Sequence, residues 1–129
     1  MTEKRERIHI LAVDDDREFL SLLHDALKED GYEIEMAGDP SEAMEKVEAS
    51  PYDLILTDKN MPEPKGAELI YKIKTKRPNS KIIVLTAFGD VESYLELMNM
   101  GIYDYLTKPI KMSELRLSIK RALKPQEAA

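Results

Sequence analysis

Four short apolar segments of the sequence each end in a polar residue that could take part in chemistry. The first ends in Asp14-Asp15-Asp16, and the other three end in Asp58, Thr86 and Lys108. Taken singly, each has an ordinary explanation. An aspartate after a strand is commonly a helix N-cap, as we expect for Asp16, and a threonine or lysine there commonly faces solvent. If the four ends meet at one edge of a sheet, they form a site that contains acids, a hydroxyl and a base.

Asp14, Asp15 and Asp58 would place three negative charges in that site. Two carboxylates ~4 Å apart repel each other by roughly 4 kcal/mol at a dielectric typical of a protein surface. The carboxyl groups must therefore take up protons or hold a cation, and an all-oxygen, partly hydrated site suits Mg²⁺. With Mg²⁺ and Lys108 added, the fixed charges of the site cancel.

A neutral site of this composition favours phosphoryl transfer. A dianionic phosphoryl group could enter it without strong repulsion. Lys108 could pair with the phosphoryl oxygens, and the hydroxyl of Thr86 could donate to one of them. Asp58 lies centrally, next to the cation, which makes it the acceptor. These residues predict a pocket in which an aspartate is phosphorylated.

The segments that must position these residues alternate regularly along the chain. Each short apolar stretch, typical of a strand, is followed by a stretch with helical spacing of apolar residues. The five helices follow the five strands, and the last helix reaches Leu123. The strands are expected at Ile8–Val13, Glu33–Ala37, Asp53–Thr57, Ile82–Leu85 and Tyr103–Thr107.

Local signals define the helices further. Asp39-Pro40-Ser41-Glu42 contains an N-cap, a proline at the first helical position and a glutamate at the third. Ser113 is the expected N-cap of the last helix. Asp90 is the expected N-cap of a helix that ends at Gly101 and carries four apolar residues at helical spacing: Val91, Tyr94, Leu95 and Met98.

Strict alternation with short connections predicts an α/β fold with a parallel sheet covered by helices on both faces. The right-handed crossover rule favours a flavodoxin-like, doubly wound (βα)5 arrangement with strand order 2-1-3-4-5. The alternating polar and apolar residues of Glu33–Ala37 agree with an edge strand. In such sheets, ligands bind beyond the carboxyl ends of strands 1 and 3, where the four polar ends would meet.

The amino-acid composition is that of a globular domain and excludes several other classes of protein. The 129 residues are 43% apolar and 34% charged, which is typical of one globular domain. The absence of cysteine excludes disulfides and cysteine-based zinc sites, and the longest apolar runs are far too short to span a membrane. A net charge of −6 disfavours nucleic acid binding. No signal-peptide core follows the charged start, so we expect a cytoplasmic protein.

Four motifs at these positions resemble the signatures of the CheY-like receiver domain of two-component response regulators. They are VDDD (Val13–Asp16), LTDKNMP (Leu56–Pro62), VLTA (Val84–Ala87) and YLTKP (Tyr105–Pro109). Their order and their places on the expected strands match the family, and the resemblance covers about Ile8 to Leu123. It predicts a receiver domain at residues 8–123, after a charged extension (1–7) and before a polar tail (124–129).

The resemblance implies roles for the site residues. Asp58 would receive a phosphoryl group from the phosphohistidine of a sensor histidine kinase or a phosphotransfer protein. Asp15 and Asp58 would bind Mg²⁺ (or Mn²⁺) directly, Asn60 would bind it through its backbone carbonyl, and Asp14 through water. The protein would be a phosphorylation-dependent switch that catalyses only its own phosphotransfer and slow dephosphorylation.

The resemblance also implies how the signal leaves the site. Thr86 and Tyr105 match the family's switch pair, in which the hydroxyl moves toward the phosphoryl group and the ring turns inward. Lys108 would precede a cis-proline. The sequence departs from the family in the loop Glu63-Pro64-Lys65-Gly66, where the usual acid is replaced by Lys65, so contacts of this loop with kinase or metal are expected to differ.

Two other classes of protein share parts of this pattern. A haloacid-dehalogenase-type phosphatase has its nucleophile in an Asp-x-Asp pair on the first strand. Here Asp58-Lys59-Asn60 lies on the third, and asparagine cannot transfer the proton. A flavodoxin-like cofactor module would need a Ser/Thr/Gly-rich phosphate loop where this chain has three acids. Turnover of p-nitrophenyl phosphate or a bound flavin would favour one of these alternatives.

Opposite charges lie on the last two expected helices. The segment Asp90–Met100 has three acids and no base, whereas Lys111–Lys124 has five bases and one acid. Charges of these signs complement the helix dipoles and commonly face solvent. A two-fold dimer could also pair the fourth helix of one copy with the fifth of the other, and the family often uses this face, with strand 5, for dimers or targets. We therefore expect a weak homodimer favoured by phosphorylation.

Overall fold

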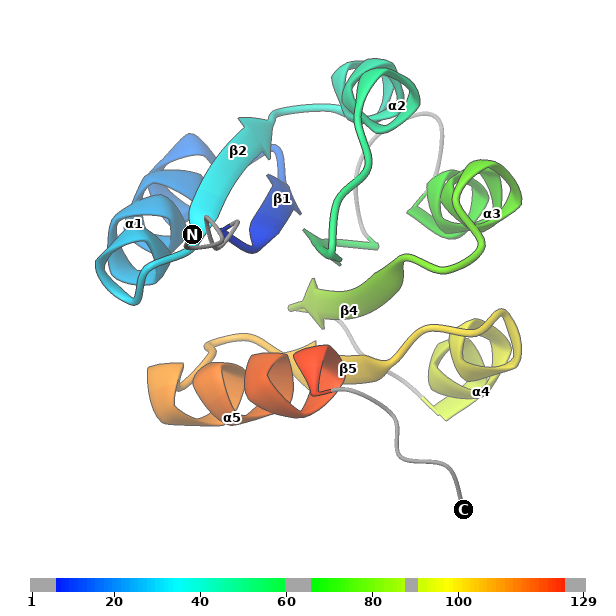
Figure 1. The fold of residues 1–129 in the computed structure, drawn as a ribbon. Helices are drawn as coiled ribbons and strands as arrows, with labels where there is room; N and C mark the ends of the chain where they lie inside the picture. The colour runs from blue at the N-terminus through cyan, green and yellow to red at the C-terminus, as the bar shows by residue number, and fades with distance from the viewer. Residues whose placement is uncertain (1–6, 60–65, 88–90, 125–129) are drawn as a thin grey trace.

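A computed structural model of the chain describes residues 7–59, 66–87 and 91–124. Five strands alternate with five helices over these ranges, as predicted (Figure 1). The strands are β1 (His9–Val13), β2 (Glu33–Ala37), β3 (Leu54–Thr57), β4 (Lys81–Thr86) and β5 (Asp104–Thr107). The helices are α1 (Arg17–Glu29), α2 (Pro40–Ala49), α3 (Gly66–Lys76), α4 (Val91–Asn99) and α5 (Met112–Leu123).

The strands form one parallel sheet of order β2-β1-β3-β4-β5, which confirms the predicted topology. The register aligns the strand ends: Val13 pairs with both Ala37 and Thr57, and Thr86 pairs with Thr107. Because all strands run in one direction, their carboxyl ends lie at the same edge. The residues that follow β1, β3 and β5 therefore emerge side by side.

Two apolar cores hold the sheet between layers of helices. One core packs α2, α3 and α4 against one face, and the other packs α1 and α5 against the opposite face (Figure 1). Alternate residues of each central strand point into opposite cores, as Leu11 and Ile10 of β1 do. Strands β3 and β4 are buried on both faces, so the backbone at their carboxyl ends is fixed by packing.

The expected N-caps are correct for two helices and wrong for one. Asp16 accepts hydrogen bonds from the backbone amides of Glu18 and Phe19, and Asp39 caps α2 with Pro40 at the first position. Ser113 does not cap α5, because the helix begins at Met112, two residues earlier than an N-cap at Ser113 would place it. Lys111 is the N-cap residue, its side chain makes no capping bond, and its carbonyl accepts from the first-turn amides.

The expected helix α4 is present, but the apolar residues at helical spacing do not form a buried face; Asp90, its expected N-cap, lies outside the described residues. Val91, Tyr94, Leu95 and Met98 are exposed, with values from 36% to 73% of their surface, whereas Leu97 is buried. The helix packs beside β5, an edge strand, so little of the molecule lies over its outer surface (Figure 1). Helical spacing identifies an apolar stripe but does not say what the stripe packs against. Here the stripe is a surface feature.

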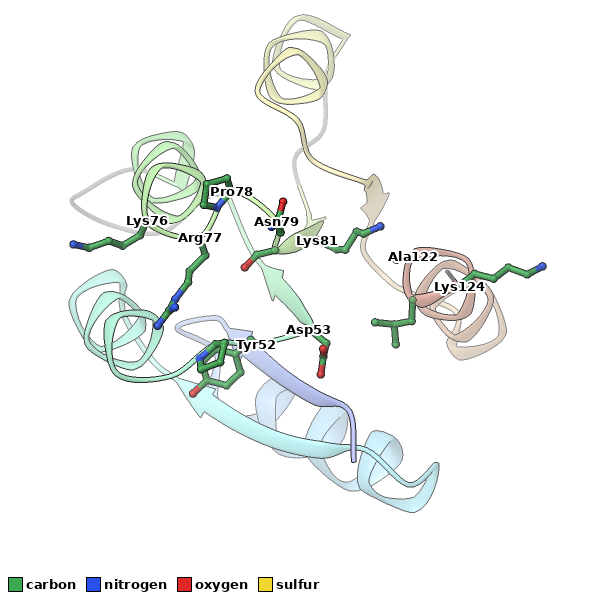
Figure 2. A pocket seen from close by; sticks show the side chains of 12 residues that line it. Tyr52, Asp53, Lys76, Arg77, Pro78, Asn79, Lys81, Ala122 and Lys124 are labelled. Carbon is green, nitrogen blue, oxygen red and sulfur yellow. The ribbon is translucent and has the colours of Figure 1, made fainter. Parts of the chain in front are cut away.

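A cavity of about 580 Å³ lies at the amino-terminal edge of the sheet, opposite the polar strand ends. The starts of β3 and β4 and the end of α5 surround it, and Figure 2 shows Asp53, Arg77 and Lys81 among its lining residues. The side chains of Lys76 and Lys124 extend outward on opposite sides rather than converging on one point. None of the helices in the described ranges is long and apolar enough to cross a membrane.

Candidate functional site

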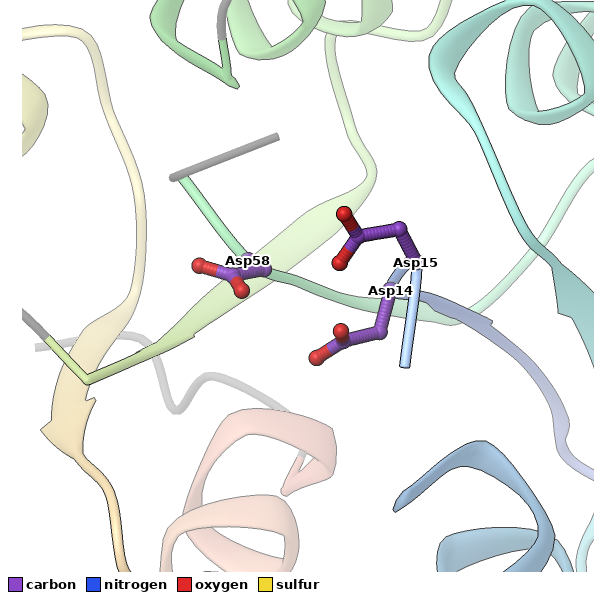
Figure 3. A group of neighbouring side chains, drawn as sticks. All are labelled: Asp14, Asp15 and Asp58. Carbon is purple, nitrogen blue, oxygen red and sulfur yellow. The ribbon is translucent and has the colours of Figure 1, made fainter. Parts of the chain in front are cut away.

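Three aspartates lie together at the carboxyl edge of the sheet (Figure 3). Asp14 and Asp15 follow β1, Asp58 follows β3, and one carboxylate oxygen from each lies within 4.8 Å of those of the other two. Asp14 and Asp58 are buried, whereas Asp15 is exposed. The structure therefore contains the predicted acidic cluster, in which two carboxylates are buried and one faces solvent.

Backbone hydrogen bonds fix the positions of the two buried aspartates. The amide of Asp14 donates to the carbonyl of Ala37 at 3.1 Å, and the amide of Asp58 donates to the carbonyl of Val13 at 3.2 Å. These bonds continue the parallel ladders one residue beyond the strands. One carboxylate oxygen of Asp14 also accepts from the amide of Asp16 at 2.9 Å, which ties the cluster to the start of α1.

Lys108 brings a positive charge from the end of β5 into the acidic cluster. Its amide donates to the carbonyl of Thr86 at 2.7 Å, and its peptide bond to Pro109 is cis, as the family resemblance implied. Its ammonium nitrogen lies 2.7 Å from Asp14 Oδ2 and 3.4 Å from Asp58 Oδ2. One lysine thus contacts both buried carboxylates.

The burial of this ion pair shifts two pKa values. Burial raises the pKa of Asp14 above its ordinary value, although the hydrogen bond from Lys108 opposes the shift. Burial also acts to lower the pKa of Lys108. The hydrogen bond to Asp14 and the charges of Asp14 and Asp58 outweigh that effect, so the pKa of Lys108 lies above its ordinary value. Lys108 is therefore a cation at neutral pH.

The donor set of the cluster fits a hard divalent cation. Asp14, Asp15 and Asp58 offer carboxylate oxygens at one point, and oxygen is the ligand atom that Mg²⁺ prefers. The exposed position of Asp15 leaves that side open to water, which Mg²⁺ usually retains in part. Asn60, the fourth expected metal ligand, and Lys65, in the divergent loop, lie outside the described residues.

Thr86 and Tyr105 lie on the neighbouring strands β4 and β5. Thr86 ends β4 and is fully buried. Tyr105 pairs with Val84, two residues before Thr86, so the side chains of Thr86 and Tyr105 lie on the same face of the sheet. The Tyr105 hydroxyl lies 2.9 Å from the Ser93 hydroxyl of α4, and its ring meets the ring of Tyr94 edge to face at 5.4 Å.

Three further residues contact the predicted site residues without having been predicted to do so: Phe19, Ser93 and Tyr94. The ring of Phe19 lies 4.3 Å from the ammonium nitrogen of Lys108, and Ser93 joins Tyr105 to α4. Phe19 stands three residues after the N-cap Asp16, and this spacing places it in the first turn of α1. Its distance from Lys108 depends on how α1 and the end of β5 pack together, which no local pattern reveals.

Comparison with known families gives a match over most of the chain. Residues 10–120 match the family described as "Response regulator receiver domain". The transcriptional regulatory protein ZraR of Escherichia coli K12 is 33% identical over 118 residues, which are 92% of this chain and 27% of that protein. ZraR of Klebsiella oxytoca is 36% identical over the same shares. The chain thus spans about a quarter of the length of these relatives.

Several solved structures with similar folds are described as receiver domains or response regulators. A CheY-like receiver domain protein from Methanospirillum hungatei JF-1 superposes with a TM-score of 0.89 at 33% identity, covering 92% of this chain and 94% of that one. The response regulator TrrA from Thermotoga maritima, solved in complex with Mg²⁺ and BeF, has a TM-score of 0.81 at 34% identity, with coverage of 90% and 99%.

Proposed function

Since the chain belongs to the family of response regulator receiver domains, which act as signalling switches, we propose that Asp58 is its phosphoryl acceptor. The observation that carries this proposal is that Asp58 belongs to a cluster of three carboxylates and also contacts a cation. Lys108 contacts it at 3.4 Å, and Asp14 and Asp15 complete the cluster. Asp58 directly follows the central strand β3, at the edge of the sheet where ligands of such sheets bind.

The proposed donor is the phosphohistidine of a sensor histidine kinase or phosphotransfer protein. A carboxylate oxygen of Asp58 attacks the phosphorus, the P–N bond breaks, and the imidazole leaves with a proton from solvent. The product is an acyl phosphate on Asp58. Hydrolysis reverses the modification when water attacks the phosphorus and the bond between phosphorus and the Asp58 oxygen breaks. In both steps Lys108 balances negative charge on the phosphoryl oxygens.

Asp14, Asp15 and Asp58 would hold the divalent cation that this transfer needs, and we propose Mg²⁺ for it. Asp15 and Asp58 would bind directly, Asp14 would bind through water, and the backbone carbonyl of Asn60 would complete the set. When bound, the ion neutralises charge on the reacting phosphoryl group. Without it, Lys108 is the cation that the structure places against the buried acids.

Thr86 and Tyr105 form the proposed relay to the surface. The Thr86 hydroxyl would donate to a phosphoryl oxygen, and the space that it leaves would admit the ring of Tyr105, on the same face of the sheet. In the present structure Tyr105 is held toward α4 by the Ser93 hydroxyl and the Tyr94 ring. Inward movement of Tyr105 would break both contacts, so α4 is the element that would respond.

The face formed by α4, β5 and α5 is the proposed site of a phosphorylation-promoted homodimer. The described part of α4 carries Glu92 and Glu96, and α5 carries basic residues in its last turn. The exposed apolar stripe of α4 adds a contact that the charges alone would not supply. Exposed ion pairs contribute only about 0–1 kcal/mol each, so the dimer should be weak and sensitive to salt.

Two measurements test these assignments. Acetyl phosphate with Mg²⁺ should phosphorylate the protein, and borohydride reduction of the acyl phosphate followed by peptide mass analysis should locate the change at Asp58. Location at another aspartate would contradict the assignment. For the dimer, sedimentation with beryllofluoride and Mg²⁺ should show association at low salt that high salt weakens. A monomer in every condition would contradict the dimer while leaving the phosphoacceptor unaffected.

A further inference from the structure

The ring of Phe19 covers the ammonium group of Lys108. The nitrogen lies 4.3 Å from the centre of the ring, within the distance at which a cation is attracted to an aromatic face. Phe19 reaches this position because it stands in the first turn of α1, where its amide donates to the N-cap Asp16 at 3.1 Å. The amide of Asp16 in turn donates to Asp14, so one short segment places two of the three groups that contact Lys108.

Two carboxylates and the ring of Phe19 contact the ammonium group of Lys108. An ammonium has three N–H donors. Asp14 Oδ2 accepts at 2.7 Å and Asp58 Oδ2 lies at 3.4 Å, while the Phe19 ring occupies a further side. Only 18% of the Lys108 side chain is exposed. Lysine side chains more commonly keep their charged end in water.

We propose that Phe19 is a positioning residue for phosphoryl transfer, acting through Lys108, an inference that rests on the proposed role of Asp58. The ring keeps the ammonium beside the acidic cluster whether its partner is the Asp58 carboxylate or a phosphoryl oxygen. A preorganised cation lowers the barrier because it need not be drawn out of solvent as charge develops on the phosphoryl group.

A purely apolar role for Phe19 makes a different prediction. Phe19 is half-buried and packs against the core formed by α1, α5 and the sheet. If packing alone mattered, a leucine of similar bulk would serve as well. If the aromatic face holds the ammonium, leucine should fail and tyrosine should succeed. The pair Phe19→Leu and Phe19→Tyr therefore separates the two roles.

The first experiment measures the contact itself in the unphosphorylated protein. The ring current of Phe19 should shift the ε-methylene protons of Lys108 upfield of those of exposed lysines. Phe19→Leu should return them to the ordinary position, and Phe19→Tyr should keep them shifted. Unshifted protons in the wild type would overturn the proposal without any reference to phosphorylation.

The second experiment measures phosphorylation by acetyl phosphate at saturating Mg²⁺. Phe19→Leu should slow the reaction about tenfold, the change expected for loss of a partly desolvated cation–π contact, and Phe19→Tyr should recover most of the rate. Tyr32→Leu is the matched control, because Tyr32 is a partly buried aromatic against the same core and far from Lys108 in the fold. An equal loss of rate in Tyr32→Leu would show a general effect of packing and would overturn the proposal.

The two possible failures are distinguishable. A wild-type protein that takes up no phosphoryl group contradicts the assignment of Asp58, and the positioning role falls with it. A wild-type protein that is phosphorylated as fast as Phe19→Leu contradicts the role of Phe19 alone. Urea unfolding of each variant identifies a rate loss that comes from partial unfolding.

Discussion

The ammonium nitrogen of Lys108 lies 2.7 Å from a carboxylate oxygen of Asp14, although 94 positions separate the two residues in the sequence. Asp14 is almost entirely buried, so this ion pair replaces the water that would otherwise surround both charges. The same ammonium contacts Asp58, the proposed phosphoacceptor. Within the described residues, Lys108 thus links the two buried carboxylates of the metal-free site.

Loss of that cation should destabilise the metal-free protein. Lys108→Met leaves buried carboxylates without the charge that both contact, and breaking such a pair costs about 3–5 kcal/mol in the free energy of unfolding. Added Mg²⁺ should recover part of the loss, because it supplies positive charge to the same carboxylates. Urea unfolding in chelator and in Mg²⁺ measures both effects. If Lys108→Met were as stable in chelator as Lys120→Met, an exposed site on α5, the shared-cation account would be wrong.

Replacement of Asp15 should have the opposite effect on the stability of the metal-free protein. It is exposed at the rim of the cluster, so Asp15→Ala removes repulsion from Asp14 and Asp58 while losing few contacts. The metal-free protein should become slightly more stable, and Mg²⁺ affinity should fall at least about tenfold as a ligand charge is lost. Calorimetric Mg²⁺ titration and urea unfolding in chelator measure the two changes. Asp25→Ala, an exposed acid of α1, is the control, and equal Mg²⁺ affinity in both variants would contradict the assignment.

Thr86 should be needed for the signal but not for the modification. Thr86→Ala should still accept a phosphoryl group at Asp58, because the nucleophile and Lys108 remain. Without the hydroxyl, the amide shifts of residues 104–107 and of α4 should change little on phosphorylation. Thr75→Ala is the control, since Thr75 is an exposed threonine whose hydroxyl donates within α3. Shift changes of wild-type size in Thr86→Ala would show that another group relays the signal.

The raised pKa of Tyr52 should make the free energy of unfolding fall at high pH. Its buried hydroxyl donates to Glu35 at 2.9 Å, and burial followed by this bond raises the pKa of Tyr52 above its ordinary value. The stabilising contribution is complete below the ordinary value of about 10 and is lost as the pH rises above it, because the unfolded state releases the proton first. Relative to Tyr52→Phe, the wild type should lose up to ~1.4 kcal/mol per pH unit there. Parallel stability curves for the two proteins would contradict this.

The sheet and the acidic cluster could be predicted because both depend on local patterns. Apolar strands alternating with helices determine a parallel sheet, and a parallel sheet brings Asp14, Asp58 and Lys108 to one edge whatever the details of packing. The prediction of this edge needed only the position at which each apolar segment ends. The strand ends moved by at most one residue between prediction and structure, which left the site unchanged.

The features that the sequence did not predict correctly are those that depend on tertiary packing. The stripe of Val91 and Leu95 has the spacing of a buried face, yet α4 presents it to solvent beside an edge strand. Ser113 is a good N-cap residue, but the backbone enters α5 at Met112. The contact between Phe19 and Lys108 joins α1 to the end of β5, and no pattern within either segment indicates it.

The measurement that tests the central claim most directly is the intact mass of the protein after incubation with acetyl phosphate and Mg²⁺. The wild type and Asp25→Asn, which changes an exposed aspartate of α1, should each gain one phosphoryl group, and chelator should prevent the gain. Asp58→Asn should gain none, because an amide in place of the carboxylate is not a nucleophile for phosphorus. A phosphoryl adduct on Asp58→Asn at the wild-type level would contradict the assignment of Asp58 as the acceptor.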